Sequence, residues 1–221
     1  MPTIMRNGHS GTIIQNGIAY GGKYDGSAEL NSMKDMYDSL VMRTVTDINY
    51  GGVDYIGSYA FQLCNNLMNV SFPNVTNIGG GAFQQCNNLM NVSFPNVTNI
   101  GGGAFQLCNN LMNVSFPNVT NIGGYAFQLC NNLEVMEIVS KTNFKEQVFN
   151  SSTNFSTLVL SNNNLSTIFS NTFYGCPFNN GTATLYVPNA LINDYLSAPN
   201  WSTILAYPNV NIMPIEGSIY E

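Results

Sequence analysis

Residues 56–77 read IGSYAFQLCNNLMNVSFPNVTN, residues 78–99 read IGGGAFQQCNNLMNVSFPNVTN, and residues 100–121 read IGGGAFQLCNNLMNVSFPNVTN. A fourth copy starts at Ile122 with IGGYAFQLCNNL and then diverges. The copies therefore recur at a fixed step of 22 residues (78 − 56). A fixed period of this length indicates a solenoid, in which each unit stacks on the previous one and none folds alone.

One side of each unit has the pattern of a β-strand. The segment Leu67-x-x-Val70-x-Phe72 has the L-x-x-L-x-L spacing of a leucine-rich repeat. Val70 and Phe72 are separated by one polar residue, which predicts a strand that points both side chains into the coil. Pro73 has no N–H to donate and ends the strand. Stacked copies then place equivalent strands side by side in a parallel sheet.

The other side of each unit is expected to be compact. The run Gly79–Gly81 allows the backbone to bend tightly. Ala82 and Phe83 begin an expected short helical or 3₁₀ segment, which buries Phe83 and Cys86 on the wall opposite the strand. The predicted fold class is therefore an α/β solenoid, with a parallel β-sheet on one face and short helical or 3₁₀ segments opposite.

The pattern continues beyond the near-identical copies. Two degenerate coils keep the buried positions of the repeat, namely Phe144, Val148, Phe149 and Ser152 in the fifth coil and Ile168, Phe173 and Cys176 in the sixth. Upstream, Val45-x-x-Ile48-x-Tyr50 fits the second half of a coil. We therefore expect about seven strands, near residues 48–50, 70–72, 92–94, 114–116, 136–138, 158–160 and 185–187.

A solenoid needs polar ends, because its terminal coils would otherwise expose core. We expect one structural domain with an N-terminal arm and capping helix at residues 1–44, the solenoid at 45–188, and an irregular C-terminal cap and tail at 189–221. The segment Ser27–Arg43 has apolar residues at helical spacing and predicts the helical N-cap. A short helix around 190–196 is expected in the C-terminal cap.

Composition and charge exclude several classes of partner. Charged residues make up only 8% of the chain, against about 25% in ordinary globular proteins. A net charge of −6 and a pI near 4.5 argue against nucleic acid or an anionic membrane as partner. No apolar run is long enough to span a bilayer, so no membrane insertion is expected. The N-terminal residues lack the apolar core of a signal peptide, so we expect no export by that route.

The sequence offers no convincing catalytic constellation. The cysteines Cys64, Cys86, Cys108 and Cys130 recur at the repeat step, and no histidine or acid recurs with them, so we expect a buried packing ladder of free thiols. His9 is the single histidine and has no visible oriented partner. We therefore predict no catalytic site, no cofactor and no bound metal, and a protein that is not an enzyme. A cryptic hydrolase built on His9 is kept as a third hypothesis.

A binding surface is more promising. Residues between the core positions of each strand are expected to face outward, in columns of methionine, asparagine and serine on the open sheet face. The candidate binding face consists of Met68, Asn69, Ser71, Met90, Asn91, Ser93, Met112, Asn113, Ser115, Glu134, Val135 and Glu137. Exposed methionine adapts to varied partners, and neutral amides and hydroxyls suit glycans or polar protein surfaces. The alternative is a solvated sheet whose asparagines bond along the stack.

The repeat resembles the BspA-like leucine-rich repeat family. The signature lies in Ile78-Gly79, Ala82-Phe83, Cys86, Leu89, Val92 and Phe94-Pro95, recurring at 22 residues over about residues 45–188. This resemblance implies a non-enzymatic solenoid used in attachment, as in surface adhesins that bind host proteins, other cells or matrix. The arm, with Asn16-Gly17-Ile18-Ala19-Tyr20-Gly21-Gly22, also looks like small structural proteins of phages and prophages.

Two hypotheses about function follow. The first is a binding protein for a protein or glycan surface, as a bacterial adhesin or a phage tail-associated protein, which the resemblance places outside the cell or on a virion. The second is a structural or assembly protein that docks into a larger particle through its arm or caps. The sequence does not indicate the ligand, the source or the oligomeric state.

Overall fold

The structure is a computed structural model that describes residues 46–221 throughout. Before them it describes the backbone of three short strands, β1 (Thr3–Arg6), β2 (Thr12–Gln15) and β3 (Ile18–Gly21). The expected capping helix at Ser27–Arg43 and the single histidine, His9, lie outside the described residues.

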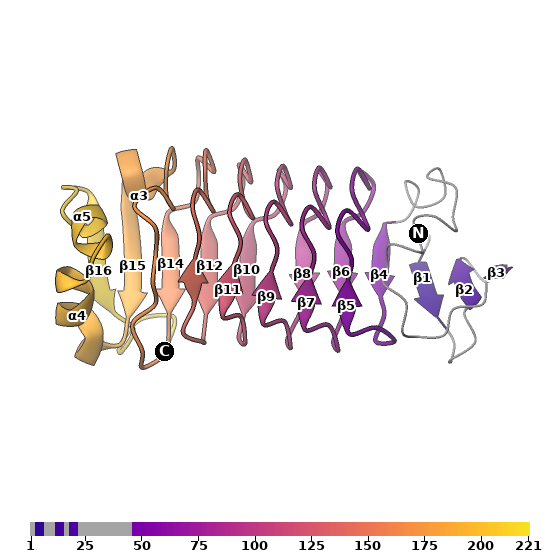
Figure 1. Cartoon of the computed structure of the whole chain (residues 1–221), viewed down its shortest axis with the longest axis horizontal. Coiled ribbons are helices and arrows are strands. Elements are labelled where there is room, and N and C mark those ends of the chain that lie inside the picture. The colour runs from indigo at the N-terminus through magenta and orange to yellow at the C-terminus, as the bar shows by residue number, and fades with distance from the viewer. Residues whose placement is uncertain (1–2, 7–11, 16–17, 22–45) are drawn as a thin grey trace.

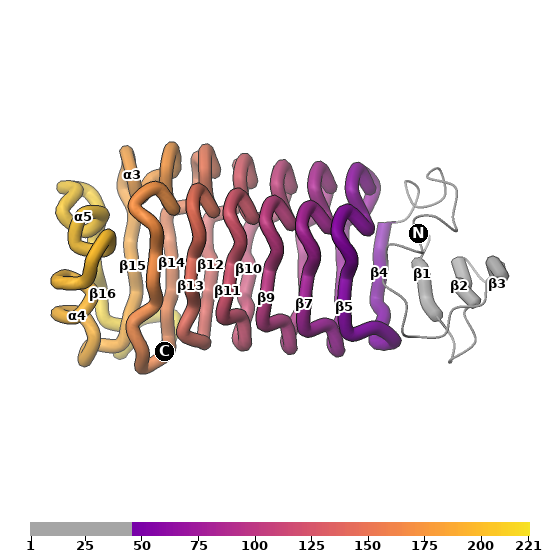
Figure 2. Tube along the Cα trace, in the orientation of Figure 1, coloured from indigo at the N-terminus to yellow at the C-terminus, as the bar shows by residue number. Residues whose placement is uncertain are grey.

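Residues 46–221 form a solenoid with two parallel sheets on opposite walls (Figures 1 and 2). The strands of one wall, which we call the large sheet, form two hydrogen-bonded parts. The first part contains β4 (Asp47–Asn49), β6 (Asn69–Ser71) and β8 (Asn91–Ser93), and the second contains β10 (Asn113–Phe116), β12 (Val135–Ile138), β14 (Thr157–Leu160), β15 (Ala183–Val187) and β16 (Val210–Pro214). The small sheet contains β5 (Tyr55–Ile56), β7 (Asn77–Ile78), β9 (Asn99–Ile100), β11 (Asn121–Ile122) and β13 (Asn143–Phe144). In both sheets the register follows the repeat, since Val70 pairs with Val92 and Ile78 pairs with Ile100.

The predicted solenoid fold is confirmed, but it contains more strands than the seven expected. Those seven correspond to β4, β6, β8, β10, β12, β14 and β15. At the C-terminal end β16 adds a further parallel strand to β15. At the other end β1 pairs in parallel with β4, and β2 and β3 continue the sheet in antiparallel order. The small sheet was also not anticipated, because two-residue strands are too short to show a period of two.

The expected helical or 3₁₀ segments in the repeats are wrong, since residues 57–176 contain turns and no helix. The Gln84 N–H donates within its own coil to the Gly81 carbonyl (3.0 Å), whereas the Phe83 N–H donates to the Ala104 carbonyl of the next coil (2.7 Å). Alternate N–H groups therefore bond between coils and cannot make the repeated local bonds of a helix. The left-handed φ of 62° at both Gly81 and Gln85 fits this chain of tight turns.

The glycine runs also let successive coils approach closely. A Cβ atom on Gly101 would lie 2.6 Å from the backbone nitrogen of Gly80 in the preceding coil. Gly123 stands in the same relation to Gly102, at 2.5 Å. The second role of these glycines is therefore to leave room for the neighbouring backbone, in addition to bending the chain.

Columns of stacked rings fill the core. The ring centroids of Phe61, Phe83, Phe105 and Phe127 follow one another at 5.1, 5.3 and 5.2 Å, and all four side chains are buried. The degenerate coils keep this packing, because Phe149 stacks on Phe173 at 5.5 Å. The buried positions predicted for the fifth and sixth coils are confirmed.

The C-terminal cap is more regular than expected. It contains the 3₁₀ helix η2 (Asn189–Leu191) and α4 (Ile192–Ser197), which confirm the helix expected around 190–196, followed by α5 (Trp201–Leu205) and β16. The short helix α3 (Pro177–Asn180) precedes β15 in the last coil of the solenoid. The Trp201 indole N–H donates to the Ser166 carbonyl (2.8 Å), and the Ser166 N–H donates to the Tyr195 hydroxyl (3.1 Å). The two rings meet edge-on at 5.2 Å and close the phenylalanine core.

Replacing Phe105 by alanine should lower the free energy of unfolding by about 3–5 kcal/mol, because the variant leaves a cavity in a core that cannot collapse. Urea denaturation followed by circular dichroism measures the change. Phe169→Ala is the matched control, since this ring is 47% exposed and its removal should cost less than about 1 kcal/mol. Equal losses in the two variants would contradict the packing of the phenylalanine column.

Candidate functional site

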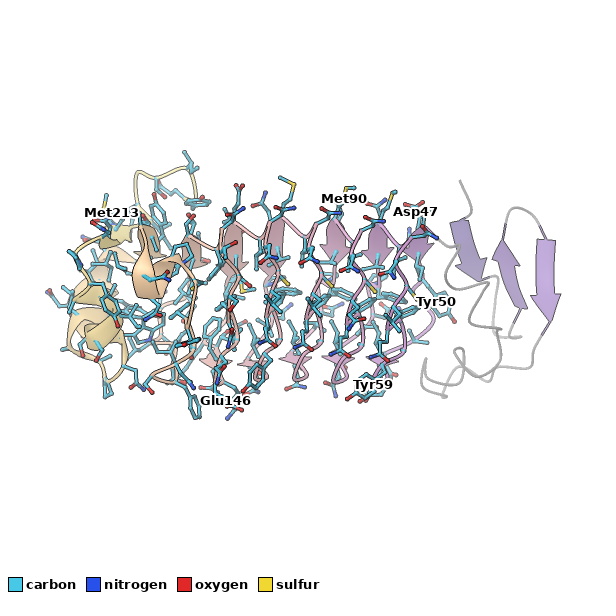
Figure 3. All side chains as sticks on the ribbon, turned by 90° about the horizontal axis from the view of Figure 1, so that it is seen from above. Asp47, Tyr50, Tyr59, Met90, Glu146 and Met213 are labelled. Atoms are coloured by element: carbon cyan, nitrogen blue, oxygen red, sulfur yellow. The ribbon has the colours of Figure 1, made fainter. Side chains whose placement is uncertain are left out.

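The outward face of the large sheet carries the candidate binding residues. Figure 3 shows Asp47 and Met90 on this face, opposite Tyr59 and Glu146 on the far wall. Met90 is 41% exposed and Met112 is 50% exposed. The asparagines and serines of β8 and β10 are exposed, whereas Met68, Asn69, Ser71, Val135 and Glu137 are half-buried and Glu134 is exposed.

Part of the asparagine column bonds along the stack. The Asn91 side-chain amide donates to the Asn69 side-chain oxygen (2.7 Å), and the Asn69 amide donates to the Asp47 carboxylate. Hydrogen bonds from the Thr46 hydroxyl and from Asn69 hold the pKa of Asp47 below its usual value. The row ends at Asn91, since the Asn113 side chain makes no such bond to it among the described residues.

The large sheet is interrupted between β8 and β10, and we call this interruption the seam. In the preceding pair of strands, the N–H groups of Met90 and Asn91 donate to the Met68 carbonyl (2.9 and 3.1 Å). Within the described residues, the equivalent N–H groups of Met112 and Asn113 have no backbone partner across the seam. The sequence does not explain the interruption, because β8 and β10 share the letters NVS.

The coils remain joined elsewhere across this interruption. In the small sheet β9 pairs with β11, through Asn99 with Asn121 and Ile100 with Ile122. The side-chain amide of Asn109 also donates to the Asn87 side-chain oxygen (3.1 Å) in the turn wall. The seam is therefore a local opening of one wall and does not separate the solenoid into two halves.

A shallow depression of about 470 Å³ lies over the seam. Its lining residues are Val92, Asn113, Val114, Ser115, Val135, Glu137 and Tyr220. Val92 occupies an inward-facing position but is only half-buried, whereas the equivalent Val70 and Val114 are 3% and 4% exposed. The seam thus partly exposes one core valine, Val92, beside polar groups, and this combination of an apolar floor with a few polar groups is typical of ligand sites.

The C-terminal tail, residues 215–221, crosses the same face. The Ile215 N–H donates to the Val187 carbonyl (2.9 Å), and the Tyr220 ring packs against Tyr186 with centroids 4.9 Å apart. Val159 lies at an outward position of β14 and is nevertheless fully buried. Burial raises the pKa of Tyr220 above its ordinary value, and the nearby Tyr186 and Glu137 raise it further. The tail therefore covers the sheet near β14 and β15 and leaves β6 to β10 open (Figure 3).

The open face is acidic where it is charged. Among residues 46–221, the outward positions of the large sheet carry Asp47, Glu134 and Glu137 and no lysine or arginine. The two described lysines, Lys141 and Lys145, lie in the turns beyond β12 and β13. This face therefore suits a neutral or cationic partner better than an anionic one.

The repeated cysteines form the predicted buried ladder, and all five cysteines are free. The Cys108 thiol donates to the Phe83 carbonyl of the preceding coil (3.2 Å), and Ser152 makes the same bond to Phe127 (2.6 Å). Burial raises the pKa of Cys130 and of Cys176 to about 12. These thiols are therefore protonated at neutral pH and serve packing.

The part of the chain that the structure describes contains neither a metal-site cluster nor a membrane-spanning helix. It brings together no group of three or more histidine, cysteine or acidic side chains that could hold a metal ion. None of its helices combines the length and the apolar character needed to cross a membrane.

Comparison with known proteins identifies the repeat. The family model described as "BspA type Leucine rich repeat region" matches six copies, over residues 42–156 and 76–191. No curated protein matches the sequence. The resemblance of the arm to phage proteins finds no counterpart in these comparisons and stays a prediction.

Solved structures of bacterial proteins share the fold. A leucine-rich repeat protein of T. pallidum is 27% identical, with a TM-score of 0.54 over 60% of this chain and 64% of that one. A leucine-rich cell surface protein from Faecalibacterium prausnitzii A2-165 is 24% identical (TM-score 0.56; 83% and 49% covered). The pneumococcal vaccine antigen PcpA is 16% identical (TM-score 0.57; 75% and 40% covered). The chain spans less than two thirds of the length of each of these proteins.

The native thiols should resist alkylation. At pH 8 iodoacetamide should label none of the five cysteines rapidly in the folded protein and all five in urea, because the thiolate is the reactive form and burial suppresses it. Intact-mass spectrometry counts the adducts. A Ser115→Cys variant is the positive control, because its thiol would lie on the open face. Rapid labelling of any native cysteine would contradict the burial of these thiols in the folded protein.

The seam should be visible in amide exchange. The amides of Met112 and Asn113 should exchange with D₂O faster than those of Met90 and Asn91, because only the latter pair is hydrogen-bonded to the neighbouring strand. The segments 89–94 and 111–116 have identical sequences, so assigned NMR spectra are required to distinguish them. Equal protection of the two pairs would show that the sheet is continuous in solution.

Proposed function

Because this chain belongs to the BspA-type leucine-rich repeat family, we propose that it is a surface recognition protein that binds a protein or a glycan through the open face of its large sheet. The observation that carries this proposal is the exposure of the methionine, asparagine and serine columns over β8 and β10. These residues repeat at the spacing of the strands and are not covered by the C-terminal tail.

The chemistry of this face supports a neutral or basic partner. Met90 and Met112 offer flexible apolar contacts. The exposed Asn91 keeps donors and acceptors beyond its one bond along the stack, and Asn113 makes no such bond to Asn91 among the described residues. The absence of cations at the described outward positions disfavours nucleic acid and anionic lipid. One structural relative is described as a cell surface protein and another as a vaccine antigen, which supports an extracellular location by analogy.

An assembly role is the second candidate, and the N-terminal strands favour it. They extend the large sheet through β1 and β4, and β3 lies at the end of the strand order. The edge of a sheet can pair with a strand of another chain. Deletion of residues 1–21 followed by light scattering tests this role. A concentration-dependent oligomer that is lost on deletion would support it, and a monomer in both forms would count against it.

Binding of the labelled protein to arrays of bacterial cell-wall fractions, glycans and matrix proteins tests surface recognition. The double variant Met90→Lys, Met112→Lys should lose at least about tenfold in apparent affinity, a change of about 1.4 kcal/mol, because it places two hydrated charges in the contact surface. Biolayer interferometry on the positive array spots gives the affinity.

The matched control adds the same charge elsewhere. Thr98 and Thr120 are exposed and precede strands of the small sheet, so Thr98→Lys, Thr120→Lys should bind as the parent protein does. Equal loss in both double variants would indicate a general charge effect. No binding to any array component would remove surface recognition and leave the assembly role.

A further inference from the structure

We infer that the seam between β8 and β10 is a docking site for an extended, basic segment of a partner protein. This inference rests on the proposed function and assigns a place and a chemistry to its ligand. It combines the unpaired main-chain groups of the seam, the partly exposed core residue Val92 and the acidic side chains beside it.

The unpaired main-chain groups indicate a peptide. Within residues 46–221, the N–H groups of Met112 and Asn113 lack across the seam the backbone acceptor that their equivalents have, and the Met90 carbonyl lacks the donors that Met68 has. The Phe94 N–H likewise has no partner in the described part of the chain, whereas the Phe72 N–H donates to the Ser93 carbonyl (3.0 Å). β8 and β10 remain neighbours, with Cα atoms within 8 Å of each other, so the peptide lies over the depression at the seam and not as an added strand between them. Main-chain amides of an extended peptide supply both donors and acceptors for such groups.

The floor of the depression accepts apolar side chains. Val92 and Val114 belong to the core and line the cavity from below, and Val135 lines it from the outward face of β12. The volume of about 470 Å³ accommodates one or two side chains. Alternate residues of an extended peptide point to the same side, so one valine of the peptide can lie on this floor.

The walls favour a cation. Glu137 lines the cavity and Glu134 precedes the same strand, and neither makes an ion pair within residues 46–221. Tyr220 of the tail forms another wall, and the face of a phenol ring attracts lysine and arginine. A neutral glycan could use the amides but would leave these carboxylates without a partner, so the basic peptide fits better.

The first experiment uses the full chain and defined probes. An acetylated, amidated, fluorescein-labelled octapeptide of alternating valine and lysine is titrated by fluorescence polarisation, beside an analogue with glutamate in place of lysine. We expect the lysine peptide to bind at least about tenfold more tightly, and added salt to weaken its binding because it screens the ion pairs. Equal affinity for the two peptides would overturn the proposal.

Matched variants separate the seam from the rest of the protein. Glu137→Gln should lower the affinity for the lysine peptide about tenfold. Glu146→Gln, on the opposite wall (Figure 3), should leave this affinity unchanged. Asn113→Pro removes an N–H that has no partner within residues 46–221, so the variant should melt as the parent protein does and should no longer bind the peptide. Asn91→Pro, in the same sequence context, breaks the bond to the Met68 carbonyl and should lower the melting temperature.

The outcomes distinguish this proposal from the broader one. If array binding is sensitive to Met90→Lys, Met112→Lys but unaffected by Glu137→Gln and Asn113→Pro, surface recognition stands and the seam site is refuted. Binding of a neutral chitin oligosaccharide in place of the lysine peptide would likewise refute it. If neither peptide, oligosaccharide nor array component binds, the proposed function fails together with the site.

Discussion

The structure depends on one constraint, which is that each coil stacks in register on a neighbouring coil of similar sequence, one strand spacing away. Residues 22 positions apart lie side by side, so side-chain amides bond to equivalent amides and phenylalanine rings stack on equivalent rings. Gln62 donates to Gln84 (2.6 Å), and Asn99 donates to Asn77 (2.8 Å). Each such bond contributes only about 0.5–1.5 kcal/mol, but bonds of this kind recur along the stack, as from Gln84 to Gln106 and from Gln106 to Gln128. A chain with 8% charged residues can use this device, because like charges at the same positions would repel one another.

The core of the fold could be predicted because its buried apolar residues recur at fixed positions in each repeat of the sequence. Val70, Phe83 and Cys86 are buried as their spacing predicts, and Ser152 replaces cysteine without losing the bond to the preceding coil. The turn wall could not be predicted in the same way. Short apolar segments such as Ala82-Phe83 have the same pattern in a helix and in successive turns, and the choice depends on bonds to a neighbouring coil.

The candidate site was less predictable than the core. The outward columns follow from the alternation of each strand, but the tail that covers Val159 is distant in sequence and carries no repeat signal. Its position depends on the C-terminal cap, where β16 joins β15 and the Ile215 N–H bonds to Val187. The seam has no sequence signal at all, since β8 and β10 share their letters with β6.

A perfectly repeated face has a disadvantage in recognition. Identical columns present the same groups at every strand, so a partner could bind at several registers with equal free energy. The seam and the tail remove this degeneracy, because among the strands of residues 46–221 only β10 lies between the seam and the wall formed by Tyr220. A partner that uses the unpaired N–H groups of Met112 and Asn113 has one register in which all its contacts are made. Selectivity on such a solenoid therefore arises where its symmetry is broken.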